Sequence, residues 1–198
     1  VELGPDDVAF RCNLVCIEDG IMRDFSAGHI TTAEAAEIVR DLHRELGRNG
    51  FEFHPGVSYR HLMVLKNGAA KFSNLEKQEI IPPHDIIGKE ITPFLPQMKE
   101  PVLTLMRKSQ SLLKYHPVND AREAKGLPPA NSIWLWGQGR SPRMITLKQR
   151  FGMDGYVISA VHLIKGIGII AGLEALEDPG ITGYFDTNYD GKARYALK

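Results

Sequence analysis

Strand-like and helix-like segments alternate along the chain, and this alternation limits the fold more than any other feature. Residues 7–17 are mostly apolar and predict a buried strand. Thr31 and Glu34 then form a capping-box sequence, which predicts a helix through Leu46 that stops at Gly47. Further strands are predicted at residues 56–65, 132–136 and 156–159, and further helices at residues 101–115, 119–125 and about 160–176. The pattern therefore predicts an α/β fold, a layered domain with a mixed β-sheet covered by helices.

Two segments between these elements have a local signature of their own. Asn67 and Gly68 form a frequent hairpin turn, so residues 69–72 are a candidate return strand. Residues 80–101 are rich in proline, which predicts an ordered loop rather than a helix or strand. His84 and Asp85 in this loop are a candidate proton-handling pair, although a turn-capping role for Asp85 is the preferred interpretation.

Composition excludes some partners and indicates a compartment. The 198 residues are 43% hydrophobic, enough for the core of one domain, and Lys+Arg and Asp+Glu are equal at 24 each. We therefore expect no nucleic acid and no membrane as partner, and no apolar run approaches the ~20 residues of a spanning helix. Cys12 and Cys16 share one face of a predicted strand, too far apart for an easy disulfide, which favours reduced thiols and a cytoplasmic protein. Because the first residue is Val1 and nothing near it resembles a signal segment, we expect the sequence to begin inside a longer protein.

Two arginines follow the predicted strand at residues 132–136. A Gly-Gln-Gly turn leads into Arg140 and Arg143, which are three residues apart and flank Pro142. Arginine side chains bind phosphate and carboxylate groups bidentately, so the pair suits a small substrate that carries both groups. The alternative is a surface turn with two solvated arginines.

Three segments resemble the archaeal-type, 2,3-bisphosphoglycerate-independent phosphoglycerate mutases of the alkaline phosphatase superfamily. They are residues 8–15 (VAFRCNLV), 132–143 (SIWLWGQGRSPR) and 157–168 (VISAVHLIKGIG). The resemblance covers nearly the whole chain and implies that residues 1–198 are the single, inserted α/β substrate-binding domain of a longer mutase. Residues from about 177 would lead back to a metal-binding domain outside this sequence.

The resemblance also implies an activity. Such mutases interconvert 3-phosphoglycerate and 2-phosphoglycerate in glycolysis and gluconeogenesis, through a phosphoserine in a domain that holds two divalent metal ions of the Mn, Mg or Zn class. This chain would hold the phosphoglycerate, contain no catalytic residue or metal ligand, bind no cofactor itself, and be inactive alone. The alternatives are a related phosphotransferase, such as a homoserine kinase that needs a carboxylate for its substrate's ammonium group, or a non-catalytic ligand-binding or oligomerisation module.

Four further residues are candidate substrate contacts by the same resemblance. Arg60 lies in the strand predicted at residues 56–65, where a solvent-facing edge position is the alternative. Asp24 and His29 lie in the loop before the capped helix, where they could bind an anion or simply form turns and caps. Lys165 precedes two glycines in the last predicted helix and could instead be a solvated helix lysine.

Two short motifs are not taken as sites. Asp19 and Gly20 resemble the start of a metal site. The neighbouring segments that resemble the mutases place them in the inserted domain, however, and the other metal-ligand motifs of such a site are missing from the sequence. Gly166 and Gly168 fit a dinucleotide-binding pattern but fall inside the predicted helix, where close packing is the preferred explanation.

Overall fold

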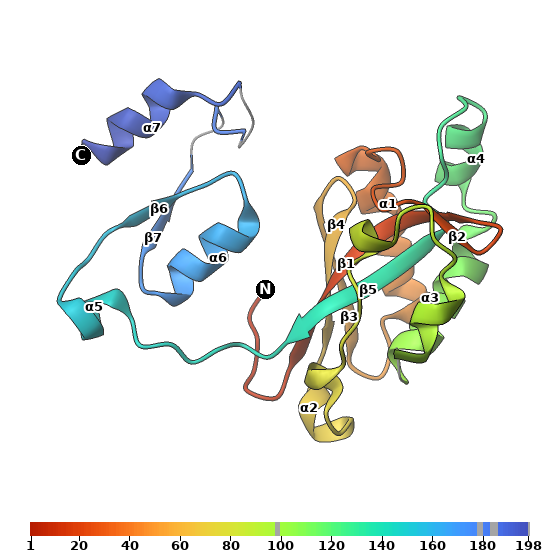
Figure 1. The fold of residues 1–198 in the computed structure, drawn as a ribbon, viewed down its shortest axis with the longest axis horizontal. Coiled ribbons are helices and arrows are strands. Elements are labelled where there is room, and N and C mark those ends of the chain that lie inside the picture. Colours follow the sequence, from red (N-terminus) through yellow and green to blue (C-terminus); the bar gives the residue numbers. More distant parts are fainter. Residues whose placement is uncertain (98–99, 178–179, 183–185, 198) are drawn as a thin grey trace. The chain divides into compact units, whose positions relative to one another are not determined.

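The computed structural model describes residues 1–97, 100–177, 180–182 and 186–197. These residues form two compact units, Val1–Ser141 and Pro142–Lys198, which are described separately (Figure 1). The division falls between Arg140 and Arg143, the two arginines that the sequence predicts to bind one substrate. The predicted return segment from about residue 177 is described only in part, because residues 178–179, 183–185 and 198 lie outside the described residues.

The first unit is built on a five-stranded antiparallel sheet (Figure 1). β1 (Val8–Glu18) pairs with β4 (Arg60–Leu65), with β5 (Ser132–Gly139) and with the short β2 (Ile21–Asp24). β3 (Phe51–Val57) extends the sheet on the far side of β4. β1 is therefore the central strand, and the buried strand predicted at residues 7–17 is confirmed.

The register of β1 gives the sheet two different faces. Phe10 pairs with Met63 and Cys12 with Leu135, and these side chains are all buried. Asn13 pairs with Arg60 on one side and with Trp134 on the other, on the opposite face. The first face holds hydrophobic core, and the second carries Arg11, Asn13 and Arg60 together with Trp134, which is also buried in the core.

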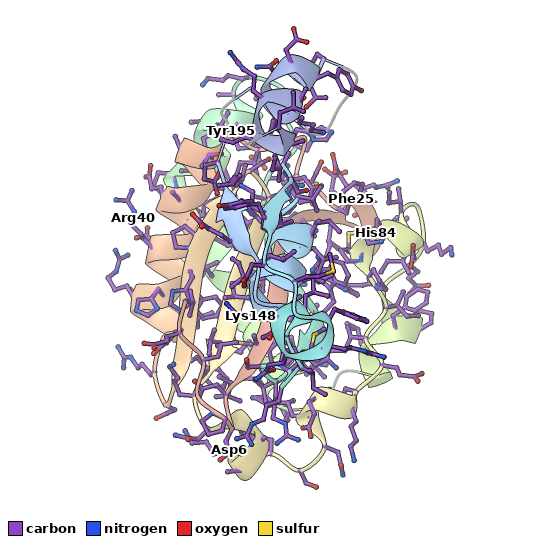
Figure 2. All side chains as sticks on the ribbon, turned by 90° about the vertical axis from the view of Figure 1, so that its left-hand side faces the viewer. Asp6, Phe25, Arg40, His84, Lys148 and Tyr195 are labelled. Carbon is purple, nitrogen blue, oxygen red and sulfur yellow. The ribbon has the colours of Figure 1, made fainter. Side chains whose placement is uncertain are left out.

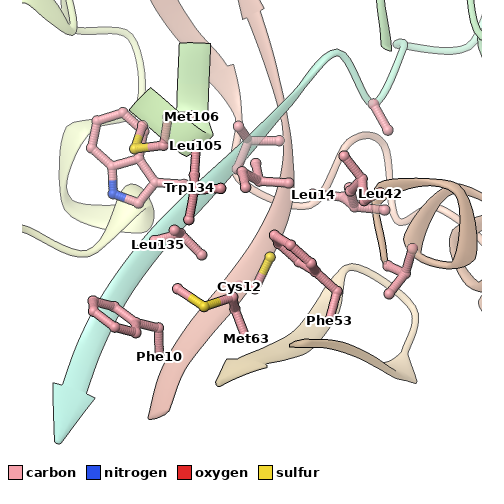
Figure 3. Close-up of a cluster of buried hydrophobic side chains, with 14 of the residues drawn as sticks. Phe10, Cys12, Leu14, Leu42, Phe53, Met63, Leu105, Met106, Trp134 and Leu135 are labelled. Carbon is pink, nitrogen blue, oxygen red and sulfur yellow. The ribbon is translucent and has the colours of Figure 1, made fainter. Parts of the chain in front are cut away.

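The helices of the first unit cover the apolar face. α1 (Thr32–Leu46) packs next to β3, and α3 (Val102–Leu113) next to β5, while α4 (Pro117–Glu123) contacts α1. The predicted capping box is present, because Thr31 Oγ1 accepts from Glu34 N and the Glu34 carboxylate accepts from Thr31 N. Figure 3 shows the core, where residues from the sheet, α1 and α3 meet; the labelled side chains are Phe10, Cys12, Leu14, Leu42, Phe53, Met63, Leu105, Met106, Trp134 and Leu135.

The hairpin predicted at residues 56–72 is present, but its turn was predicted at the wrong place, at Asn67 and Gly68. The chain reverses at Ser58, between β3 and β4, with Ser58 in the left-handed region at φ 54°. Asn67 is also left-handed, but it precedes α2 (Gly68–Lys71), so residues 69–72 are mainly helical and form no strand. A serine in a left-handed turn has little sequence signature, whereas Asn-Gly has a strong one, and this difference explains the error.

The described part of the proline-rich segment at residues 80–101 is ordered, as predicted, and two of three short 3-10 helices lie in it, while the first of them precedes it. They are η1 (Leu75–Lys77), η2 (Pro83–Ile86) and η3 (Thr92–Gln97). The segment packs along β5, where Trp134 Nε1 donates to Ile81 O at 2.9 Å, and it pairs with β2 through an Ile21–Glu90 bridge. It therefore brings η2, with His84, close to the central strands.

The second unit is small and contains a parallel strand pair. After α5 (Leu147–Phe151), β6 (Tyr156–Ile158) and β7 (Glu174–Leu176) pair through α6 (His162–Ile170), and α7 (Tyr189–Ala196) ends the unit. The helix predicted to run to residue 176 is therefore too long, because the chain turns at Gly172, at φ 86°. A Cβ at Gly168 would lie 2.5 Å from Val157 Cγ1, so the predicted close-packing role is confirmed there. The same prediction is wrong for Gly166, where an added Cβ would meet no atom within 4 Å.

The predicted α/β layered class is confirmed. Antiparallel and parallel pairings are both present, but they lie in separate sheets. Cys12 and Cys16 are free and buried, as expected. Within the described part of the chain, no helix combines the length and the apolar character needed to cross a bilayer.

Candidate functional site

The polar face of the sheet presents two arginines beside the central asparagine of β1. Arg60 pairs directly with Asn13, and Arg11 precedes Asn13 by two residues on the same face. Arg11 and Arg60 are thus diagonal neighbours, a relation that separates Cβ atoms by about 7–8 Å or somewhat less. Both guanidinium side chains are exposed, whereas Asn13 is buried. An anion on this face could reach both arginines.

Asn13 fixes its neighbours through both ends of its amide. Its Oδ1 accepts from Trp136 Nε1 at 3.0 Å, and its Nδ2 donates to Phe25 O at 3.2 Å. The Arg11 guanidinium carbon lies 4.8 Å from the centroid of the Trp136 ring, a cation–π contact. The corresponding carbon of Arg60 lies 5.1 Å from the Tyr59 centroid. Aromatic rings therefore support both arginines.

A series of edge-to-face ring contacts links these elements. Centroid distances are 6.2 Å for His29–Tyr59, 5.4 Å for Tyr59–Phe25, 6.0 Å for Phe25–His84 and 5.4 Å for His84–Trp136. Figure 2 shows Phe25 and His84 near one another, on the other side of the first unit from Arg40. We call this set the arginine–aromatic cluster; its residues are Arg11, Asn13, Phe25, His29, Tyr59, Arg60, His84 and Trp136.

Asp24 organises the loop that carries His29. One carboxylate oxygen accepts from Ser26 N and Ser26 Oγ, both at 2.6 Å, and the other accepts from Gly28 N at 2.8 Å. Burial raises the pKa of Asp24, but the hydrogen bonds from Ser26 and Gly28 outweigh it, so the pKa lies below its usual value. Asp24 is therefore ionised at neutral pH and engaged with its own loop.

Arg140 directly follows β5, whose last residue, Gly139, lies three positions after the cluster residue Trp136. Gly139 pairs with Ala9, four residues along β1 from Asn13, which corresponds to roughly 13 Å of strand. Arg140 Nη1 is 4.0 Å from Asp6 Oδ1, and Nη2 is 3.8 Å from Glu76 Oε1.

Arg143 and Lys165 belong to the second unit. Arg143 is exposed in the segment before α5. Lys165 Nζ bonds both oxygens of Glu177, at 2.8 and 2.7 Å. The structure thus brings Asp24, His29 and Arg60 together, and the roles predicted for Arg140, Arg143 and Lys165 stay predictions.

Sequence reasoning missed several members of the cluster, of which Arg11 and Asn13 left a usable signal. They are polar residues spaced by two in a strand that is otherwise apolar, and this spacing places both on one face. His84 was considered only with Asp85, whereas its ring contacts are with Phe25 and Trp136. Asp19 and Gly20, set aside as a metal motif, form the turn between β1 and β2.

The first 119 residues match the family model described as 2,3-bisphosphoglycerate-independent phosphoglycerate mutase. The chain belongs to this family. All cluster residues except Trp136 lie within the matched part.

Curated relatives agree with this assignment over the whole chain. A 2,3-bisphosphoglycerate-independent phosphoglycerate mutase from Methanosarcina barkeri is 48% identical over 200 residues, which cover all of this chain and 49% of the relative. A probable enzyme of the same name from Geobacter sulfurreducens is 47% identical and covers all of this chain and 50% of its own length. The chain therefore spans about half the length of these mutases.

Two solved structures share the fold. A protein from Pyrococcus horikoshii superposes with a TM-score of 0.70 at 22% identity, over all of this chain and 45% of its own. A cofactor-independent phosphoglycerate mutase from Thermoplasma acidophilum gives a TM-score of 0.53 at 23% identity, over 98% of this chain and 52% of its own. At these identities the likeness concerns the fold alone.

Proposed function

We propose that this chain is the substrate-holding half of a phosphoglycerate mutase that interconverts 3-phosphoglycerate and 2-phosphoglycerate in glycolysis and gluconeogenesis. The observation that carries the proposal is the presence of Arg11, Arg60 and His29 on one polar face of the first unit. Both substrates carry a phosphate and a carboxylate, and the guanidinium group suits both anions.

The charge of the cluster favours this function over a homoserine kinase. Homoserine carries an ammonium group, for which a free carboxylate would be the natural partner. Two carboxylates adjoin the cluster: that of Asp24, whose oxygens already accept from Ser26 and Gly28, and that of Asp85, whose Oδ1 lies 3.7 Å from His84 Nε2. The remaining charged groups of the cluster are the cations Arg11 and Arg60.

The proposed reaction requires that the protein hold the substrate between two phosphoryl-transfer steps. The phosphate leaves one hydroxyl and returns to the other, so the glycerate must be retained and turned while it is not covalently attached. Arg11 and Arg60 would bind an anionic group of the substrate, and the Tyr59 and Trp136 rings would keep the two guanidinium groups in place. His29 would contact the ligand at the edge of the cluster. In the same proposal Arg140, Arg143 and Lys165 supply further anion contacts.

We place the metal-dependent phosphoryl transfer in the other half of the enzyme, of the alkaline phosphatase superfamily. Two divalent ions would there activate the phosphoryl group. Across residues 1–97, 100–177, 180–182 and 186–197, no three His, Cys, Asp or Glu side chains lie together as a metal site would need. The side chains of these residues therefore do not fit a two-metal site.

We also propose that residues from about 177 lead to that other half, and that the complete protein acts in the cytoplasm. The length of the relatives supports the first point, as do the exposed apolar side chains of α6, among them Leu163, Ile164 and Ile167. Free, buried Cys12 and Cys16 support the second.

Substitution of the cluster arginines in the complete enzyme tests the proposal. Arg11→Ala and Arg60→Ala should each lower kcat/KM for 3-phosphoglycerate by about 10- to 100-fold, because each removes a charge-assisted hydrogen bond to a bound anion. Arg40→Ala, on the outer surface of α1 (Figure 2), is the matched control and should leave kcat/KM unchanged. Wild-type kcat/KM in both cluster variants would refute the assignment.

A further inference from the structure

The loop that presents His29 has an unusual backbone. Ala27, Gly28 and His29 are consecutive left-handed residues, with φ values of 48°, 63° and 51°. Alanine and histidine favour other conformations, so surrounding contacts must hold the loop in this form. Asp24 supplies contacts from within the loop, and Arg122 supplies them from outside.

Arg122 is a buried cation whose nitrogens all point to acceptors. Its side chain on α4 is 2% exposed. Nε donates to Pro128 O at 3.0 Å, Nη1 to Glu34 Oε2 at 3.0 Å, and Nη2 to Ala27 O at 2.5 Å. The planar guanidinium group thereby ties together the loop, the first turn of α1 and the segment after α4.

The loop also sits directly against Arg122. A Cβ added to Gly28 would lie 3.3 Å from Arg122 Nη2 and 2.9 Å from Pro128 Cδ, so the backbone there leaves no room for a larger residue. At the end of the loop, Ser58 Oγ donates to Ile30 O at 2.6 Å. The hairpin with Tyr59 and Arg60 is therefore joined to the same loop.

We propose that Arg122 is a positioning residue for the substrate site. It fixes the left-handed loop through Ala27 O and so sets the place of His29 beside Tyr59 and Arg60. Arg122 is not itself a ligand contact, because it lies buried behind the loop and its nitrogens are engaged. The identity of the ligand rests on the proposed function, whereas the effect on the loop does not.

A double-mutant cycle in the complete enzyme separates positioning from a general role in stability. Arg122→Lys keeps the charge but cannot reach three acceptors at once. We expect it to weaken 3-phosphoglycerate binding about tenfold when His29 is present, and by less than about twofold in the His29→Ala background. Arg40→Lys on α1, an arginine-to-lysine change at an exposed position, should leave the dissociation constant unchanged. Equal weakening in both backgrounds, or no weakening in either, would overturn the proposal.

Hydrogen exchange reports on the loop without any ligand. Arg122→Lys should speed exchange at the Gly28 and His29 amides, and unchanged exchange there would also overturn the proposal. If Arg122→Lys does not fold, Glu34→Gln carries both measurements, because it retains a capping-box side chain while it removes the charge that Arg122 binds. If the wild-type enzyme binds no phosphoglycerate, the proposed function fails, and hydrogen exchange alone decides the role of Arg122.

Discussion

Asp7 is a nearly buried carboxylate at the start of β1 whose ionised form the fold stabilises. It accepts from Lys66 Nζ and Asn67 N, both at 2.9 Å, and from Gly4 N at 2.8 Å. Burial alone would raise the pKa, but these hydrogen bonds lower it to about 2, from 3.8 for an ordinary aspartate. Because the folded pKa is depressed, the contribution to stability is complete above about pH 4 and disappears as pH falls towards 2.

We therefore expect Asp7→Asn to lower the free energy of unfolding by about 2 kcal/mol at pH 7. The deficit should shrink as pH falls from 4 and vanish near pH 2. Denaturant unfolding of the complete protein at several pH values measures it. Asp6→Asn is the control, since Asp6 is exposed and its contact with Arg140 is long, at 4.0 Å. A deficit that does not change with pH would show that the carboxylate charge is irrelevant.

Individual residues of the site show what the sequence could and could not predict. Asp24, His29 and Arg60 came from the resemblance, and the structure places them together. Arg11 was overlooked because the other side chains around it are apolar and the whole segment read as buried. Its contact with Trp136 depends on strand register, which the sequence does not specify.

The two glycines of α6 differ in what surrounds them. A Cβ at Gly168 would overlap Val157 on β6, whereas one at Gly166 meets no atom within 4 Å. We expect Gly168→Ala to separate α6 from β6 and to speed hydrogen exchange in both. Gly166→Ala should stabilise the helix by about 0.5–1 kcal/mol, because alanine loses less backbone freedom than glycine. Similar behaviour of the two variants would contradict the packing role of Gly168.

Elements with explicit end signals were predictable, and those without them were not. The helix from Thr32 begins at a capping box and was found at the expected place. The helix predicted at residues 160–176 is a shorter helix followed by β7, because a continuous apolar run does not distinguish a helix from a buried strand. Pairing of β6 with β7 brings together residues about 18 positions apart, a long-range contact that local sequence does not encode.

For the whole molecule, the proposed division of labour predicts that residues 1–198 alone are inactive. The purified chain should not interconvert phosphoglycerates with either Mn²⁺ or Mg²⁺ added, because we place the phosphoryl-transfer residues in the other half. An assay that follows 2-phosphoglycerate formation from 3-phosphoglycerate measures this. Turnover that rises in proportion to chain concentration, with contaminating mutase excluded, would refute the division.

β1 contributes to both the core and the proposed site, and this has a consequence for sequence change within the family. Phe10, Cys12 and Leu14 alternate with Arg11 and Asn13. Deletion or insertion of one residue inside β1 would exchange the two sets, putting a guanidinium group into the core and aromatic or aliphatic groups on the ligand side. We therefore expect insertions and deletions among homologues to fall in turns such as Asp19–Gly20 and not in residues 8–18. This should hold even for homologues of low sequence identity.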